Sequence, residues 1–136
     1  MDIAIVGATG NVGRKTLEVL EKKELTIENL YLVASSKSAG KKINFKGKDL
    51  EVFDLENFDF SKVKIAFFAA GGKISEKFAE KAAKNCFVID NSSFYRMDSN
   101  VPLIVPQVNS NHLNNIKKNI IATVSYTHLR AHETEL

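Results

Sequence analysis

Three glycines near the start of the chain, Gly7, Gly10 and Gly13, have a spacing suited to binding a phosphate group. They follow the apolar run 3–6 and precede a helical pattern, which predicts a strand, a tight turn and the start of a helix. In the related GxGxxG fingerprint of dinucleotide-binding folds, glycines make the turn, let a pyrophosphate approach the backbone, and allow close packing of helix on strand. The alternative is a glycine-rich turn that binds nothing.

The helix that follows this turn is expected to begin near Asn11, a residue type that often caps helix N-termini. Its first backbone N–H groups and the positive end of its dipole would point at whatever lies over the turn, so a phosphate is the natural ligand. The apolar face predicted for this helix, which should end near Lys23, is Val12, Thr16, Leu17 and Leu20.

A second candidate segment, Ser35 to Ser38, follows the apolar run 31–34. NAD-binding domains usually place an acidic residue at the end of this strand to hold the ribose 2′-hydroxyl. Segment 34–38 has no carboxylate but has serine hydroxyls and Lys37, which would bind a 2′-phosphate, so the sequence favours NADP over NAD. A polar loop without a ligand is the alternative.

Loops 70–73 and 91–96 also follow predicted strands, 65–70 and 87–89. In an open parallel sheet, ligands bind outside the carboxyl ends of the strands, so these loops and the two above are candidates for one site.

The continuous apolar runs predict parallel strands buried on both faces. Other expected elements are a hairpin (43–45 and 50–53, turn 46–49), a helix (75–84), an edge segment between Pro102 and Pro106, a short helix from about Asn109, and a last strand (120–122).

Together these elements predict an α/β protein with a Rossmann-like, doubly wound, mostly parallel sheet in a single domain over residues 1–122. The chain has 136 residues, 44% hydrophobic and 26% charged, which is ordinary for one globular domain. Its 19 basic and 16 acidic residues are too nearly balanced to indicate a nucleic-acid partner. No apolar run approaches the roughly 20 residues of a membrane span, and no signal peptide is evident, so we expect a cytoplasmic protein without a membrane partner.

Residues 123–136 break this pattern and are predicted to be an unrelated, disordered or foreign tail. His128 and His132 lie four residues apart, which superficially resembles a metal-ligand spacing. The segment lacks a third ligand and a catalytic glutamate, so no metal site is predicted.

Beyond the glycine motif, the chain resembles the N-terminal, cofactor-binding part of aspartate-semialdehyde dehydrogenase. The most specific segments are Asp90-Asn91-Ser92-Ser93 to Arg96-Met97-Asp98, and Val101-Pro102-Leu103 to Pro106-Gln107-Val108-Asn109. The resemblance implies reduction of aspartyl 4-phosphate, an acyl phosphate, to the semialdehyde with NADPH, in lysine, threonine and methionine biosynthesis, by an enzyme that is a homodimer at full length. It implies that Arg96 grips the substrate phosphate, and that cofactor contacts come from Gly7, Thr9, Gly10, Asn11, Val12, Gly13, Ser35, Ser36, Lys37, Ser38, Ala70, Gly71, Asn91 and Ser92.

The chain departs from this family where the nucleophile is expected. After the run 120–122 the family continues into Asn-Pro-Asn-Cys, whereas this chain reads Thr123-Val124-Ser125. The single cysteine, Cys86, opens a buried strand at the end away from the site, so no catalytic residue is assigned and the chain is expected to be a truncated, inactive fragment. Two alternatives remain: a fragment of the sister N-acetyl-glutamyl-phosphate reductase, and a non-catalytic NADP-binding module. The family usually has arginine in place of Lys37, and arginine contacts phosphate better.

Overall fold

The structure is a computed structural model that describes residues 1–23, 26–104 and 119–123. Its strands form an eight-stranded sheet in the order β3-β4-β2-β1-β5-β6-β8-β7. The strands are β1 (Asp2–Val6), β2 (Asn29–Ala34), β3 (Lys42–Phe45), β4 (Lys48–Asp54), β5 (Ile65–Phe68), β6 (Phe87–Asp90), β7 (Leu103–Ile104) and β8 (Ile120–Thr123). The helices are α1 (Asn11–Lys22) and α2 (Gly72–Ala83), with two 3₁₀ turns, η1 (Leu55–Asn57) and η2 (Phe60–Lys62).

The sheet is parallel at every pairing except that of β3 with β4. Strands β2, β1, β5 and β6 are consecutive neighbours, so their carboxyl ends lie along one edge, which we call the carboxyl edge. The predicted Rossmann-like, doubly wound sheet with β1 near its centre is therefore confirmed. The four candidate loops all leave from the carboxyl edge.

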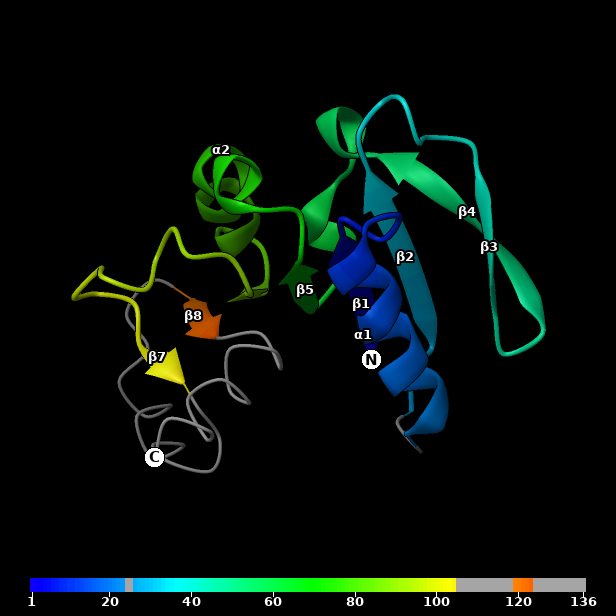
Figure 1. Cartoon of the computed structure of the whole chain (residues 1–136), viewed down its shortest axis with the longest axis horizontal. Helices are drawn as coiled ribbons and strands as arrows, with labels where there is room; N and C mark the ends of the chain where they lie inside the picture. The colour runs from blue at the N-terminus through cyan, green and yellow to red at the C-terminus, as the bar shows by residue number, and fades with distance from the viewer. Residues whose placement is uncertain (24–25, 105–118, 124–136) are drawn as a thin grey trace.

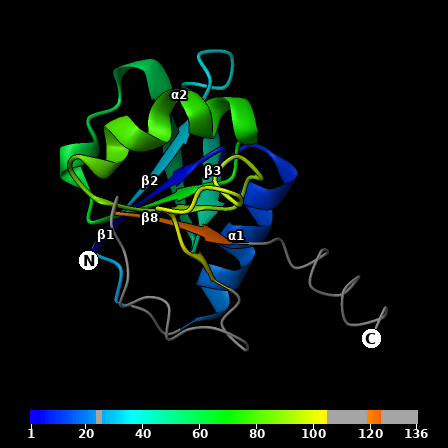
Figure 2. The same ribbon diagram turned by 90° about the vertical axis from the view of Figure 1, so that its left-hand side faces the viewer.

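One helix covers each face of the sheet, as Figures 1 and 2 show, with α2 and α1 on opposite sides. Alternation along β1 produces this arrangement: Ala4 and Val6 belong to the apolar cluster that includes Phe78 of α2, while Ile5 belongs to the cluster that includes Leu17 of α1. Buried Leu17 and Leu20 confirm half of the predicted face of α1. Thr16 is half-buried, and the side chain of Val12 is 41% exposed.

Two of the boundaries that differ from the sequence predictions involve glycines. The hairpin turn has two residues, Lys46 and Gly47, both with positive φ, because pairing extends to Phe45 opposite Lys48. Helix α2 begins at Gly72 rather than near Ser75, since Gly71 serves as its N-cap with a φ of 91°. The double glycine that ends the apolar run is therefore part of the helix start and not a separate loop.

The remaining predictions concern residues 102–136, of which the structure describes 102–104 and 119–123. The segment after Pro102 forms β7 at the edge of the sheet, as its prolines predicted. Strand β8 runs to Thr123, one residue past the expected domain boundary. The helix expected from Asn109, the histidine pair and the tail 124–136 lie outside the described residues. No helix in the described part is long and apolar enough to cross a membrane.

Candidate functional site at the carboxyl edge

The glycine turn between β1 and α1 is held by backbone contacts that leave no room for side chains. Gly7 has a φ of 90°, and a Cβ there would lie 2.7 Å from the carbonyl oxygen of Ala69. A Cβ on Gly13 would overlap the carbonyl oxygen of Gly7 and lie 2.8 Å from its carbonyl carbon. Helix α1 therefore starts directly against the end of β1, as the spacing predicted.

The start of α1 has no side-chain cap. Its N-cap is Gly10, not Asn11 as the residue type suggested, and no side chain of the described residues bonds there. The first N–H groups of a helix have no partner within the helix. Because Gly10 has no side chain to satisfy them, these groups are available to an anion over the turn.

A hollow of about 320 Å³ lies beside this turn at the carboxyl edge. It brings together residues from three of the four candidate loops, namely Gly7, Thr9 and Gly10 from the first, Ser35 from the second, and Ala70 from the third. Leu55 and Ile74 add apolar surface, which the sequence analysis did not predict. Among the described residues, Thr9 Oγ1 lies 3.3 Å from Ser38 Oγ, so the first two loops also touch directly.

The second loop differs from the sequence prediction in one respect that bears on the cofactor. No carboxylate occurs in segment 34–38, but the structure brings in Asp54 from the end of β4, where it pairs in register with Ala34. The Ser36 hydroxyl donates to Asp54 Oδ2 at 2.9 Å. A carboxylate therefore lies beside Ser36, although segment 34–38 itself contains none. A distant strand supplies the carboxylate, and the sequence around Ser36 gave no sign of it.

The loop after β6 is anchored by a fully buried carboxylate, Asp90. Its Oδ1 accepts hydrogen bonds from Ser75 Oγ at 2.7 Å and from the Ser92 backbone N at 3.0 Å. Its Oδ2 accepts a hydrogen bond from Ser92 Oγ at 2.8 Å. Since Ser92 turns both of these donors inward, its main observable role is to tie the loop to Asp90. The sequence signal for this anchor was a charged residue directly after the apolar run 87–89, because a buried charged residue there needs hydrogen-bond partners.

Arg96 lies on the same loop, with its guanidinium partly buried. Its Nη2 donates to the carbonyl oxygen of Asn91 at 3.2 Å. Its Nε is buried and has no hydrogen-bond partner among the described residues. Asn91 is held in turn by Thr123, whose Oγ1 lies 3.4 Å from Asn91 Oδ1. Arg96 therefore keeps one buried donor without a partner among the described residues, and an arginine guanidinium suits an anionic ligand.

Comparison with known proteins matches residues 2–116 to a protein family described as semialdehyde dehydrogenase, NAD binding domain. The chain belongs to this family. As a member of the semialdehyde dehydrogenase NAD-binding domain family, it carries the glycine turn, the loop after β2 and the loop after β6 within the matched segment.

Similar proteins include an aspartate-semialdehyde dehydrogenase of Rickettsia bellii, 47% identical over 123 residues. That match covers 89% of this chain but 36% of the relative, so the chain spans little more than a third of that protein's length. Among solved structures, aspartate semialdehyde dehydrogenase II of Vibrio cholerae, complexed with ASA, is 43% identical with a TM-score of 0.90 over 96% of this chain and 43% of that one. The Candida albicans enzyme, solved with NADP, is 27% identical with a TM-score of 0.72 over 89% of this chain and 41% of that one.

The opposite edge of the sheet, which we call the amino edge, contains Cys86. This residue directly precedes β6, is 7% exposed, and its Sγ lies 3.3 Å from the Ala82 carbonyl oxygen. Burial raises the pKa of the Cys86 thiol to about 11. The Cys86 thiol is therefore buried at the end of β6 away from the candidate loops, and its raised pKa favours the protonated, less nucleophilic form.

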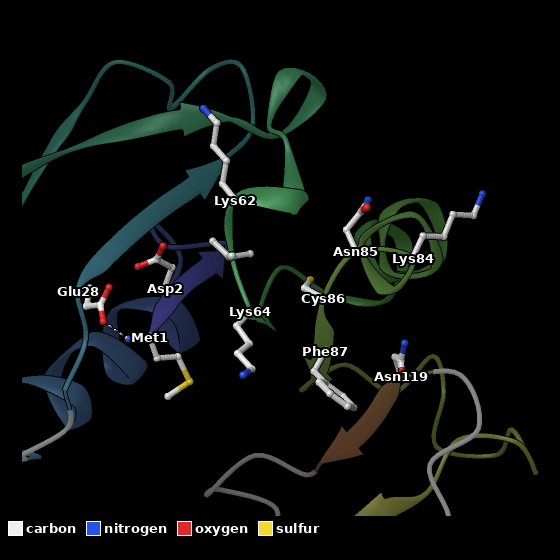
Figure 3. Close-up of a pocket in the computed structure, with 11 residues that line it drawn as sticks. Met1, Asp2, Glu28, Lys62, Lys64, Lys84, Asn85, Cys86, Phe87 and Asn119 are labelled. Carbon is white, nitrogen blue, oxygen red and sulfur yellow. Dashed lines mark ion pairs between the residues drawn. The ribbon is translucent and has the colours of Figure 1, made fainter.

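Cys86 lines a hollow of about 580 Å³ at the amino edge, larger than the one beside the glycine turn. Figure 3 shows that Lys62, Lys64 and Lys84 around it point in different directions and do not converge on a common point. The amino group of Met1 pairs with Glu28 at 3.5 Å. No group of three potential metal ligands occurs in the described part of the chain.

Proposed function

We propose that the chain is the dinucleotide-binding part of an NADP-dependent aspartate-semialdehyde dehydrogenase, the enzyme that reduces aspartyl 4-phosphate to the semialdehyde in lysine, threonine and methionine biosynthesis. One observation carries this proposal: the uncapped start of α1 opens at the glycine turn, beside a hollow that Ser35 also lines. Membership of the NAD-binding domain family supports the cofactor class. The relatives' names support the substrate class.

The residues present fit a dinucleotide. Segment 10–12 would hold the pyrophosphate at the positive end of α1, and the Ser35 to Ser38 segment with Lys37 would receive the 2′-phosphate of NADP. Leu55 and Ile74 provide apolar surface of the kind on which an adenine ring packs. When bound, the nicotinamide would supply the hydride, and the protein would contribute binding, orientation and electrostatics.

The loop after β6 would serve the substrate. Arg96 has a guanidinium with a buried donor free of partners among the described residues, and a planar fork of this kind suits the phosphate of an acyl phosphate. Asp90 holds the loop by accepting from both donors of Ser92, so the arginine is carried by an anchored segment. Asn91 and Ser92, on the same loop, would then lie near the nicotinamide and the phosphates.

The chain's own activity is a separate question, and we propose binding without turnover. The chemistry of this enzyme class needs a thiol that reaches the acyl carbon, and Cys86 lies at the amino edge. The assay is the reverse reaction, with semialdehyde, NADP and phosphate, followed by NADPH absorbance. We expect no rate above a protein-free blank. A rate that disappears in Cys86→Ser would refute both the assignment of binding only and the packing role of Cys86.

Binding is tested by isothermal titration calorimetry of the whole chain with NADP and with NAD. Gly10→Ala is the informative variant, because its Cβ would meet the Gly7 carbonyl oxygen at an ordinary 3.5 Å, yet it adds a methyl group where the pyrophosphate should approach. We expect saturable binding by the parent chain and a loss of about tenfold or more in the variant. Absence of saturable binding of either nucleotide to the folded parent chain would refute the proposed function.

A further inference from the structure

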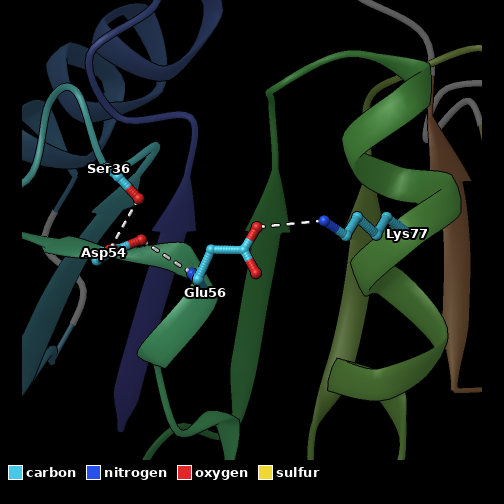
Figure 4. Close-up of polar contacts among 4 residues, drawn as sticks. All are labelled: Ser36, Asp54, Glu56 and Lys77. Carbon is cyan, nitrogen blue, oxygen red and sulfur yellow. Dashed lines mark hydrogen bonds and ion pairs between the residues drawn. The ribbon is translucent and has the colours of Figure 1, made fainter.

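The carboxyl edge carries a chain of polar contacts that the glycine motif does not account for. Ser36 Oγ donates to Asp54 Oδ2 at 2.9 Å, and Asp54 Oδ1 accepts from the Glu56 backbone N at 3.0 Å. Glu56 in turn pairs with Lys77 of α2 at 3.2 Å. Figure 4 shows these contacts running from the loop after β2 to α2. They lie next to Ser35 and Leu55, both of which line the hollow.

The Asp54 carboxylate determines which way the Ser36 hydroxyl faces. An ionised carboxylate is an acceptor only, so the hydroxyl must donate its single hydrogen to Asp54. Ser36 then has only lone pairs left for a ligand. It can accept a hydrogen bond from a ribose 2′-hydroxyl, but it has no hydrogen to donate to a 2′-phosphate.

The charge of Asp54 acts in the same direction. Glu56 has Lys77 as an ion-pair partner, whereas the described residues contain no ion pair to Asp54. A phosphate next to Ser36 would therefore meet an uncompensated negative charge. Lys37 is exposed on the same loop and attracts a phosphate, so the two residues oppose each other.

We propose that Asp54 is a specificity-determining residue that weakens binding of the 2′-phosphate, so the pocket discriminates less between NADP and NAD than segment 35–38 alone would. The proposal rests on the proposed function, because it concerns the same nucleotide site. Lys37 recognises the 2′-phosphate, whereas Ser36, held by Asp54, recognises the 2′-hydroxyl.

The test compares Asp54→Asn with the parent chain by calorimetry, using NADP and NAD separately. Asparagine keeps its oxygen for the Glu56 N–H, removes the charge, and places its NH2 donor beside Ser36, which frees the hydroxyl to donate to a ligand. We expect NADP to bind about fivefold more tightly and NAD to change by less than about twofold, with the NADP gain shrinking as salt is raised. The double variant Ser36→Ala/Asp54→Asn separates the hydroxyl from the charge, and should lose part of that gain.

Asp59→Asn is the matched control. Asp59 caps η2 as Asp54 caps η1, but its Oδ1 accepts from the Ser61 backbone N at 3.0 Å and from Ser61 Oγ at 2.7 Å, whereas Asp54 accepts from Ser36 of the loop after β2. Asp59→Asn should change neither affinity. The proposal is overturned if Asp54→Asn leaves the NADP affinity unchanged, or strengthens both nucleotides equally. If the folded parent chain binds neither nucleotide, the proposed function itself fails and the proposal falls with it.

Discussion

The two edges of the same sheet differ in a way that cavity size does not reveal. The amino edge has the larger hollow, about 580 Å³ against about 320 Å³, and it contains the chain's cysteine and several lysines. The carboxyl edge has the glycine turn, the buried Asp90 and the Nε of Arg96, which has no partner in the described part of the chain. The candidate site lies at the smaller hollow. Strand direction places the helix N-termini and the candidate loops at that edge, and the volume of a hollow does not decide which edge they occupy.

The physical origin of this difference is the parallel sheet. Each of β1 and β5 is followed by a helix that begins at the carboxyl edge, so both α1 and α2 direct their N-termini to that side. Both helices begin after a glycine N-cap with no side-chain hydrogen bond. The amino edge receives helix C-termini and strand starts, and its lysines diverge into solvent, where their charges are screened.

The largest effect should come from breaking the glycine packing at the carboxyl edge. Gly13→Ala places a Cβ into the Gly7 carbonyl, so we expect a loss of about 3 kcal/mol or more in the free energy of unfolding, measured by urea titration. Gly72→Ala is the matched control at the start of the other helix, because its Cβ would meet Phe94 Cβ at an ordinary 3.9 Å. Equal stability of Gly13→Ala and the parent would contradict the close contact of α1 with β1.

A smaller loss should follow removal of the buried charge that anchors the loop after β6. Asp90→Asn replaces one acceptor oxygen by a donor that faces Ser75 or Ser92, so about 2 kcal/mol should be lost in the same measurement. Asp59→Asn changes an exposed carboxylate with similar serine contacts and should cost much less. Equal losses in the two variants would show that burial of Asp90 does not matter.

Charge reversal at each edge tests where the nucleotide binds. Lys37→Glu should weaken NADP binding by about tenfold and leave NAD nearly unchanged, because a carboxylate would replace the cation beside the 2′-phosphate. Lys62→Glu makes the same change at the larger hollow of the amino edge and should affect neither nucleotide. Calorimetry of both variants decides between the edges, and an NADP loss in Lys62→Glu but not in Lys37→Glu would place the site at the amino edge.

The smallest predicted effect is the alkaline titration of Cys86. Burial raises its pKa from 9.0 to about 11, so the folded state holds the proton more tightly than the unfolded state. The free energy of unfolding is unaffected by this group below pH 9 and falls as the pH rises towards 11. The loss at pH 10 is about 1 kcal/mol. Comparing unfolding of the parent with Cys86→Ala at pH 8 and pH 10 isolates this term from that of Tyr95, whose pKa is also raised, to about 12. A constant difference between the two proteins would contradict burial of the thiol.

Much of the fold follows from local patterns that act over a few residues. The apolar run 3–6 ending at Gly7 predicted β1 and the turn, because only glycine accepts that backbone without a steric clash. Pro102 predicted an edge position for the segment that follows, since proline cannot donate to a strand ladder. The gathering of the candidate loops at one edge was also predicted, because the carboxyl ends of parallel strands share an edge.

The polar partners of the site depend on residues far apart in the chain. Asp54 reaches Ser36 only because β4 turns back from the hairpin and pairs in parallel with β2, bringing residues 18 positions apart into hydrogen-bond contact. Asp90 and Ser75 meet because α2 lies over β6. Cys86 lies at the amino edge because β6 runs parallel to β5 and begins there. Strand direction and register are properties of the assembled sheet. Local periodicity predicts which segments become strands, but a carboxylate's neighbour across the sheet is decided by how those strands pair.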